Sequence, residues 1–242
     1  MTDLQAYLIA FTGFIIAITI ILIASGKVCR WLIRFMMTLL VLQTVFYGVR
    51  ILSLPFPKNI TLAQILHSGY IISYSFYAGC FTGYFVTTVF FKGKVNVFKA
   101  LLLQNMPVLY KLLRYSVASV FLWSSIASIY QYNKALHFFT ISGYSSAFFI
   151  FIIIVELLGG IGLLFRKTTL YVVLLLECDM IGAIYTHYHN YFTKQLPDPL
   201  GNSIPSLITQ TVLITIIIFT LYDNKNHQLN DLPNRSANAN PL

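Results

Sequence analysis

Charged residues are scarce in this chain of 242 residues: Asp, Glu, Lys and Arg together make up 10%, whereas hydrophobic residues make up 57%. A water-soluble domain of this size cannot bury that much apolar surface, so the composition excludes a soluble protein. It also leaves too little polar chain for a separate globular catalytic domain. Runs of about 20 apolar residues are what a membrane-spanning helix requires. The sequence therefore predicts an all-α integral membrane protein whose main partner is the lipid bilayer.

Acidic residues and cysteines are also few. Sixteen Lys and Arg outnumber seven Asp and Glu, which gives a net charge of +9. Because bilayer proteins collect basic residues on their cytoplasmic side, this excess indicates topology and not a nucleic-acid partner. The three cysteines, Cys29, Cys80 and Cys178, form no C-x-x-C pair, so neither a disulfide framework nor a thioredoxin-like centre is predicted.

Seven apolar runs are long enough to cross a membrane: residues 6–24, 35–54, 63–91, 114–132, 145–165, 168–188 and 204–222. No basic segment precedes the first run, which is typical of a retained helix and not of a signal peptide. Twelve Lys and Arg flank these runs on one side and four on the other, the four being Arg50, Lys58, Lys134 and Lys194. This asymmetry predicts an N-terminus outside and a cytoplasmic C-terminus, and we expect a bacterial inner membrane.

The chain is expected to divide into three parts. Residues 1–110 would form an N-terminal three-helix membrane extension that leads into a cytoplasmic amphipathic helix, Val95 to Leu113, interrupted by Pro107. Residues 111–222 carry the last four spans. Residues 223–242 contain few apolar side chains and are expected to be a disordered cytoplasmic tail.

Three carboxyl side chains lie inside predicted spans: Glu156, Glu177 and Asp179. A charge in this position costs about 2.5–3.5 kcal/mol to insert, so each carboxyl requires a partner, a cavity or a proton. Glu177 and Asp179 are separated by about 200° around a helix, and they cannot both face one neighbour. Asp179 begins a small polar stripe with Gly182, Ala183 and Thr186, which favours an inward position. We expect Glu156 and Asp179 to form an intramembrane polar pocket, while Glu177 either joins it or reaches a neighbouring subunit. Hydrogen bonding between helices is the plainer alternative.

Histidines close the sixth predicted span. His187 lies two turns beyond Asp179 and is expected at the outer mouth of the pocket. Asp198 in the following loop could join His187 and His189 as an oxygen ligand, but a metal site needs this third ligand in the right place, which the spacing does not fix. Interfacial capping by His and Tyr is the commoner arrangement, so no metal is predicted.

Glycines mark two places where helices can approach closely. Gly79 and Gly83 form a G-x-x-x-G element in the third predicted span. Gly159 and Gly160 lie in the fifth span, and Ala183 in the sixth. Helix packing is the expected role of all five positions, with a homo-oligomer contact as the alternative at the first pair.

The second half of the chain resembles the DoxX family of small four-helix membrane proteins. The resemblance rests on VELLGGIGLLFRKTTLY, from Val155 to Tyr171, followed by MIGAIYTH, from Met180 to His187. It covers about residues 111–222 and implies a DoxX-like four-helix bundle there. The segment SSIASIYQYNK, from Ser124 to Lys134, departs from the glycine-rich end with a lysine that is typical of the family's first helix.

The resemblance implies association with membrane redox systems. The cofactor stays open, with quinone as a candidate, and redox proteins are candidate partners. The chain is then an accessory subunit of a quinone- or thiol-linked system; if it is an enzyme at all, it is a membrane oxidoreductase subunit. Two alternatives from other classes stay open: a small-solute or proton-coupled transporter, and a non-catalytic membrane scaffold. No broken helices or matching half-repeats are visible, which weighs against a transporter.

Overall fold

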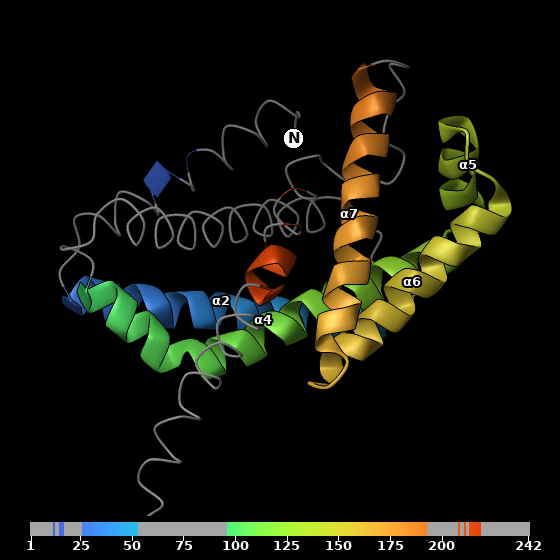
Figure 1. The fold of residues 1–242 in the computed structure, drawn as a ribbon. Helices are drawn as coiled ribbons and strands as arrows, with labels where there is room; N and C mark the ends of the chain where they lie inside the picture. The colour runs from blue at the N-terminus through green and yellow to red at the C-terminus, as the bar shows by residue number, and fades with distance from the viewer. Residues whose placement is uncertain are drawn as a thin grey trace, which may run out of the picture.

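The computed structural model describes residues 12, 15–16, 26–52, 96–192, 208, 211 and 213–218. Every regular element within these residues is a helix (Figure 1): α2 (Gly26–Leu52), α4 (Asn96–Tyr130), α5 (Tyr132–Ser142), α6 (Ser146–Leu164) and α7 (Thr169–Phe192). A further helical stretch covers residues 213–218. For the described residues, the predicted all-α class is confirmed.

Four helices are long and apolar enough to cross a membrane. They are Gly26–Leu52, Gln104–Tyr130, Ser146–Leu164 and Thr169–Asn190, and they correspond to the second, fourth, fifth and sixth predicted spans. Nearly all of 6–24, all of 63–91 and much of 204–222 lie outside the described residues, as does the tail at 223–242. The chain is therefore a multi-pass membrane protein, and the count of seven stays a prediction.

The start of α4 differs from the expectation of a separate amphipathic helix before the fourth span. One helix runs unbroken from Asn96 to Tyr130, with Pro107 inside it. Proline removes one backbone hydrogen bond and crowds the preceding turn. Within a helix whose flanks are both strongly helical, this change can produce a bend and leave the helix continuous. The expected boundary at residues 110 and 111 consequently falls within a continuous element.

Helix α2 packs along α4 through a stripe of side chains spaced three and four residues apart. The stripe consists of Cys29, Leu32, Ile33, Met36, Leu40, Gln43 and Tyr47. This spacing places every member on one face of an α-helix. The other face exposes large apolar side chains such as Leu42 and Val45, as expected for contact with lipid. The apolar members of the stripe share one core with α4, α7 and residues 213–217.

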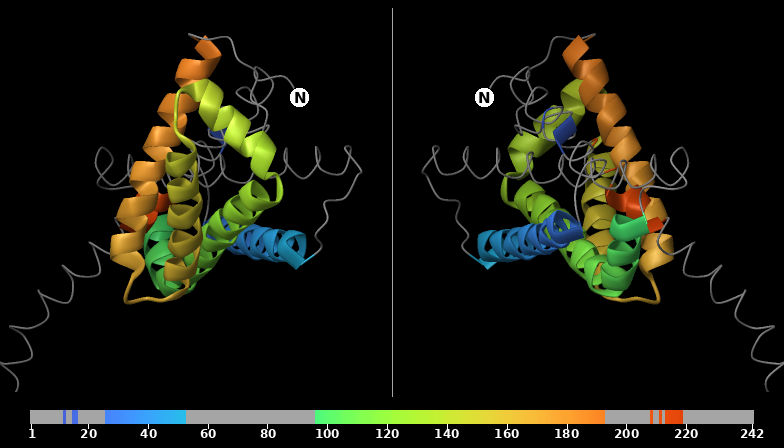
Figure 2. Two further views of the ribbon diagram at one scale, coloured as in Figure 1. Left: turned by 90° about the vertical axis from the view of Figure 1, so that its right-hand side faces the viewer. Right: turned by 90° about the vertical axis from the view of Figure 1, so that its left-hand side faces the viewer.

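Helices α6 and α7 form a hairpin joined by the short turn Phe165–Thr168, and α2 runs at a steep angle to it (Figure 2). At the other end of α6, Gly143 adopts φ 97° and ends α5, with the amide of Tyr144 donating to Phe139 O at 2.9 Å. Glycine is the residue that adopts this left-handed conformation without strain. Ser145 then begins α6 by accepting a hydrogen bond from the Phe148 amide at 3.2 Å.

Candidate functional site

The hairpin brings Glu156 and Asp179 to a similar distance from the turn. Glu156 lies eight residues before Leu164, the last residue of α6, and Asp179 lies ten residues after Thr169, the first residue of α7. The two carboxyl groups are close enough to interact electrostatically. Both acids lie inside helices that are long and apolar enough to span a membrane.

Glu156 is held between α6 and α4. Its side chain is 8% exposed, and its Oε1 accepts a hydrogen bond from Ser124 Oγ at 2.9 Å. Ser124 comes from the segment where the sequence departs from the family pattern, and the sequence analysis did not single it out. A serine hydroxyl rotates freely and can donate to a carboxylate or accept from a carboxylic acid, so it suits a group that changes protonation state.

Asp179 completes the pair from α7. Its Oδ2 is buried and has no hydrogen-bond partner among the described residues. An unsatisfied buried oxygen of this kind is unfavourable and calls for a proton, a water molecule or a ligand. The acid pair, defined here as Glu156 and Asp179 with Ser124 beside them, is therefore built from three helices and has one oxygen left to bind.

Glu177 does not join the acid pair. Its Oε1 accepts a hydrogen bond from Thr215 Oγ1 at 2.7 Å, on the helical stretch 213–218 of the same chain. Its Oε2 is buried without a hydrogen-bond partner in the described part. The 200° separation from Asp179 explains why the two carboxyls on α7 face different neighbours.

Glycines bring the three helices of the site together. A Cβ at Gly159 would lie 2.5 Å from Leu176 Cδ2 of α7, and one at Gly160 would lie 2.8 Å from Leu122 Cγ of α4. Gly162 meets Val172 in the same way. Side chains at these positions would force the helices apart and separate the acid pair.

The expected polar stripe on α7 is only partly inward. Ala183 packs against the core, but a Cβ at Gly182 would meet nothing within 4 Å. The expected packing glycines Gly79 and Gly83 lie outside the described residues.

Arg114 fixes the turn end of the hairpin. It is buried, and its Nε and Nη2 both donate to the carbonyl of Leu163, at 3.0 and 2.7 Å. A carbonyl in the last turn of a helix has no partner within that helix, so the guanidinium satisfies it and ties α4 to α6. The sequence analysis treated Arg114 only as a basic flank.

The opposite end of α7 is held by α5 and the segment after it. His187 is buried and stacks on Phe138, with ring centroids 4.9 Å apart. Asn190 Nδ2 donates to Ser142 Oγ at 2.6 Å. Tyr144 Oη and Thr186 Oγ1 are 2.9 Å apart, and because Thr186 donates to Gly182 O, Tyr144 is the donor.

His187, which the sequence analysis expects at the outer mouth of the pocket, is buried at this polar end. Asn190 is 3% exposed, and its Oδ1 lacks a hydrogen-bond partner within the described ranges. Helix α5, which supplies Phe138, was not predicted, because the chain between the fourth and fifth apolar runs is too short and mixed to show a periodic pattern.

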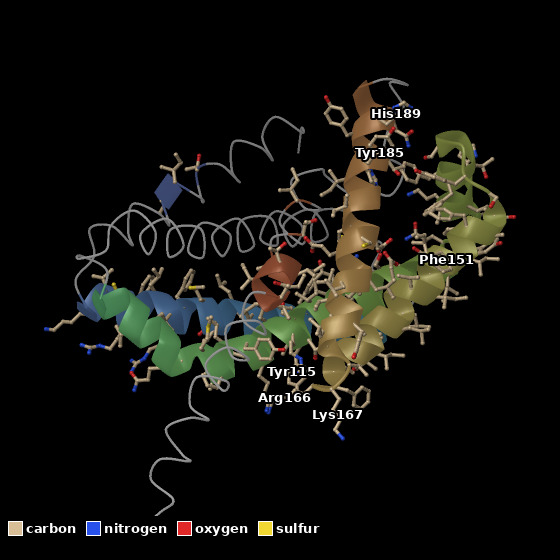
Figure 3. All side chains as sticks on the ribbon, viewed as in Figure 1. Tyr115, Phe151, Arg166, Lys167, Tyr185 and His189 are labelled. Carbon is tan, nitrogen blue, oxygen red and sulfur yellow. The ribbon has the colours of Figure 1, made fainter. Side chains whose placement is uncertain are left out.

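A metal centre does not form from the histidines that the structure places. No three His, Cys, Asp or Glu side chains gather in a ligand set in the part of the chain that is described. His189 stacks on Tyr185 instead, with centroids 6.0 Å apart, and both lie at the end of α7 far from Arg166 and Lys167 (Figure 3). The third expected ligand, Asp198, lies outside the described residues.

The fold and site together define a helical multi-pass membrane protein with an acid pair inside its span region. The DoxX family model matches residues 109–189, a stretch that begins in α4 and ends near the end of α7. The predicted resemblance is confirmed over this segment, which is similar to the DoxX family of membrane proteins. No curated protein and no solved structure matches the chain.

Proposed function

We propose that this chain is an accessory subunit of a quinone- or thiol-linked membrane redox system, in which Glu156 and Asp179 hold and exchange a proton inside the bilayer. The observation that carries the proposal is the acid pair itself. Glu156 is buried and bonded to Ser124, and Asp179 Oδ2 is buried without a partner among the described residues, both inside candidate spans. The family resemblance over residues 109–189 supports the redox association.

The chemistry of the pair favours proton exchange over a fixed charge. Two ionised carboxylates this close repel each other, and an apolar surrounding strengthens the repulsion. One proton shared between them removes it, and such a pair titrates as a unit. The Ser124 hydroxyl stays hydrogen-bonded to Glu156 in either state.

A quinone fits the donors that the pair offers. Its carbonyl oxygens accept hydrogen bonds, and a carboxyl that holds a proton donates one. Asp179 Oδ2, buried and without a partner among the described atoms, is the free position. A bound quinone would supply electron-carrying chemistry there, while Asp179 and Glu156 would orient it and hold the proton.

Infrared difference spectroscopy over a pH series tests the acid pair directly. The full chain in lipid nanodiscs should show a band of protonated carboxyl that titrates with pH. Glu156→Gln should remove or shift that band, and Asp179→Asn should alter the same band because the pair titrates as a unit. Glu177→Gln is the matched control, since it removes an equivalent carboxyl of α7 that bonds Thr215 instead. Equal spectra for Glu156→Gln and wild type would refute proton exchange at the pair.

Extraction of lipid from the purified chain tests the redox association. Quinone should co-purify with wild type and with Glu177→Gln, and less of it with Asp179→Asn. A titrating pair without any bound quinone, together with pH-dependent solute uptake in vesicles, would favour the proton-coupled transporter instead. If the acid pair shows no titrating band and no quinone co-purifies, the result would favour the non-catalytic membrane scaffold.

A further inference from the structure

Three exposed cations gather at the turn end of the α6–α7 hairpin. Arg166 and Lys167 lie in the turn itself, and Lys111 lies on the exposed side of α4. Figure 3 shows Tyr115 of α4, Arg166 and Lys167 at this end of the molecule. We call Lys111, Arg166 and Lys167, together with Tyr115, the basic patch.

The contacts of Arg114 explain why residues from two parts of the chain meet here. Its two hydrogen bonds to Leu163 O hold α4 against the last turn of α6. Lys111, one turn before Arg114, then places its Nζ 5.9 Å from the centroid of the Tyr115 ring. Arg166 in turn is close enough to α4 to act electrostatically on Tyr110. The patch is thus a fixed feature of the α4–α6 contact.

Among the described residues, no acidic side chain neutralises the positive charge of the patch. The acidic residues among those described are Glu156, Glu177 and Asp179, and all three lie well inside candidate spans. None of the three patch cations forms an ion pair with a described residue. Three like charges held close together attract an anion from outside the chain.

The depth of the patch selects the kind of anion. One candidate span ends at Leu164 and the next begins at Thr169, so Arg166 and Lys167 lie where the hydrocarbon region ends. Lys111 lies two turns inside the candidate span Gln104–Tyr130, and a lysine near a span end can extend its charged head to the interface. Lipid headgroups occupy this depth, and tyrosine side chains are favoured there. Phe165, the first residue of the turn, is 60% exposed and can contact acyl chains beside the patch.

We propose that Lys111, Arg166 and Lys167 bind the phosphate of an anionic phospholipid at this end of the hairpin. Tyr115, whose ring Lys111 approaches, lines the headgroup, while Phe165 packs against the upper part of an acyl chain. Charge complementarity and depth carry the assignment, and it is independent of the proposed proton exchange at the acid pair.

Retention of lipid by the purified full chain tests the proposal. The protein is reconstituted in phosphatidylcholine nanodiscs that contain a minor fraction of phosphatidylglycerol, and the enrichment of each lipid around the protein is measured by mass spectrometry. The test variant replaces Lys111, Arg166 and Lys167 with Gln. The control replaces Lys27, Arg30 and Arg34 of α2 with Gln, which removes the same charge from exposed positions elsewhere.

Wild type and control should enrich phosphatidylglycerol over phosphatidylcholine. In the test variant, this enrichment should be at least tenfold lower than in wild type. Each cation near an anionic lipid surface contributes roughly fivefold. If the triple variant does not fold, Arg166→Gln alone, a change in an exposed turn, should lose about fivefold. Equal losses in test and control variants would mean that cations anywhere on the protein attract anionic lipid equally well, and this result would overturn the proposal. Displacement of the lipid by millimolar inorganic phosphate would assign the site to free phosphate and would overturn it as well.

Discussion

Replacing Gly160 with alanine should loosen the contact between α6 and α4 that supports the acid pair. The added Cβ would lie 2.8 Å from Leu122 Cγ and 3.1 Å from the backbone nitrogen of Leu122. A flexible side chain could turn away from such a methyl group, but the backbone nitrogen can move only if the helix moves. Gly160→Ala is therefore an overpacking change at a helix-helix contact.

The magnitude follows from two opposing terms. Overpacking of this kind costs about 1–3 kcal/mol, whereas alanine is favoured over glycine within a helix by about 1 kcal/mol. The net destabilisation at Gly160 is then about 1–2 kcal/mol when the overpacking cost lies in the upper part of its range. For a chain of this length, roughly 2–4 °C of melting temperature corresponds to each kcal/mol.

Gly182→Ala is the matched control on α7. A Cβ at Gly182 meets nothing within 4 Å, so this variant keeps the gain in helix propensity and has no overpacking cost. Thermal unfolding in detergent should place Gly160→Ala below wild type and Gly182→Ala at or above it. A Gly160→Ala protein as stable as Gly182→Ala would refute the close contact.

Two further outcomes follow from the turn end of the hairpin. Arg114→Ala should lower the free energy of unfolding by about 1.5–3 kcal/mol, because it removes a charged donor from the Leu163 carbonyl. Arg114→Lys should recover part of this loss in the same unfolding assay. Unchanged stability in both variants would contradict a stabilising role of the two hydrogen bonds to Leu163 O. In a cysteine-free background, a membrane-impermeant thiol reagent added to intact cells should label Lys134→Cys and not Lys167→Cys, as the predicted topology requires. The reverse labelling would place the turn outside.

The depth and direction of the acids could be read from the sequence. Counting from the basic flanks places Glu156 and Asp179 at the middle of adjacent spans, and helical geometry turns Glu177 away from Asp179. The structure has the same arrangement, with Glu177 bonded to Thr215. These features depend on position along a helix and on spacing around it, and both are visible in one sequence.

The partners of the acids could not be read in this way. The segment from Ser124 to Lys134 contains several small polar residues, and the rotation of α4 against α6 decides that Ser124 meets Glu156. Arg114 looks like an ordinary basic flank because its hydrogen bonds are made to a residue 49 positions later. Contacts across helices depend on helix rotation, which a hydropathy pattern does not encode.

The two ends of the α6–α7 hairpin differ in a way that bears on proton exchange. Toward the turn, the contact between α6 and α7 is made by Gly159 and Gly162 against the apolar side chains of Leu176 and Val172, and Leu163 is fully buried. Toward the other end, the contacts of α7 include the Tyr144 hydroxyl and the Asn190 amide. Protons move between polar groups and water, and apolar packing excludes both. We therefore expect the pair to exchange protons with the side of the membrane that carries Asn190. Infrared spectra of oriented vesicles, in which the pH is changed on one side at a time, should show a carboxyl band that responds to the pH on that side. A band that follows only the pH on the side of the turn would contradict this direction.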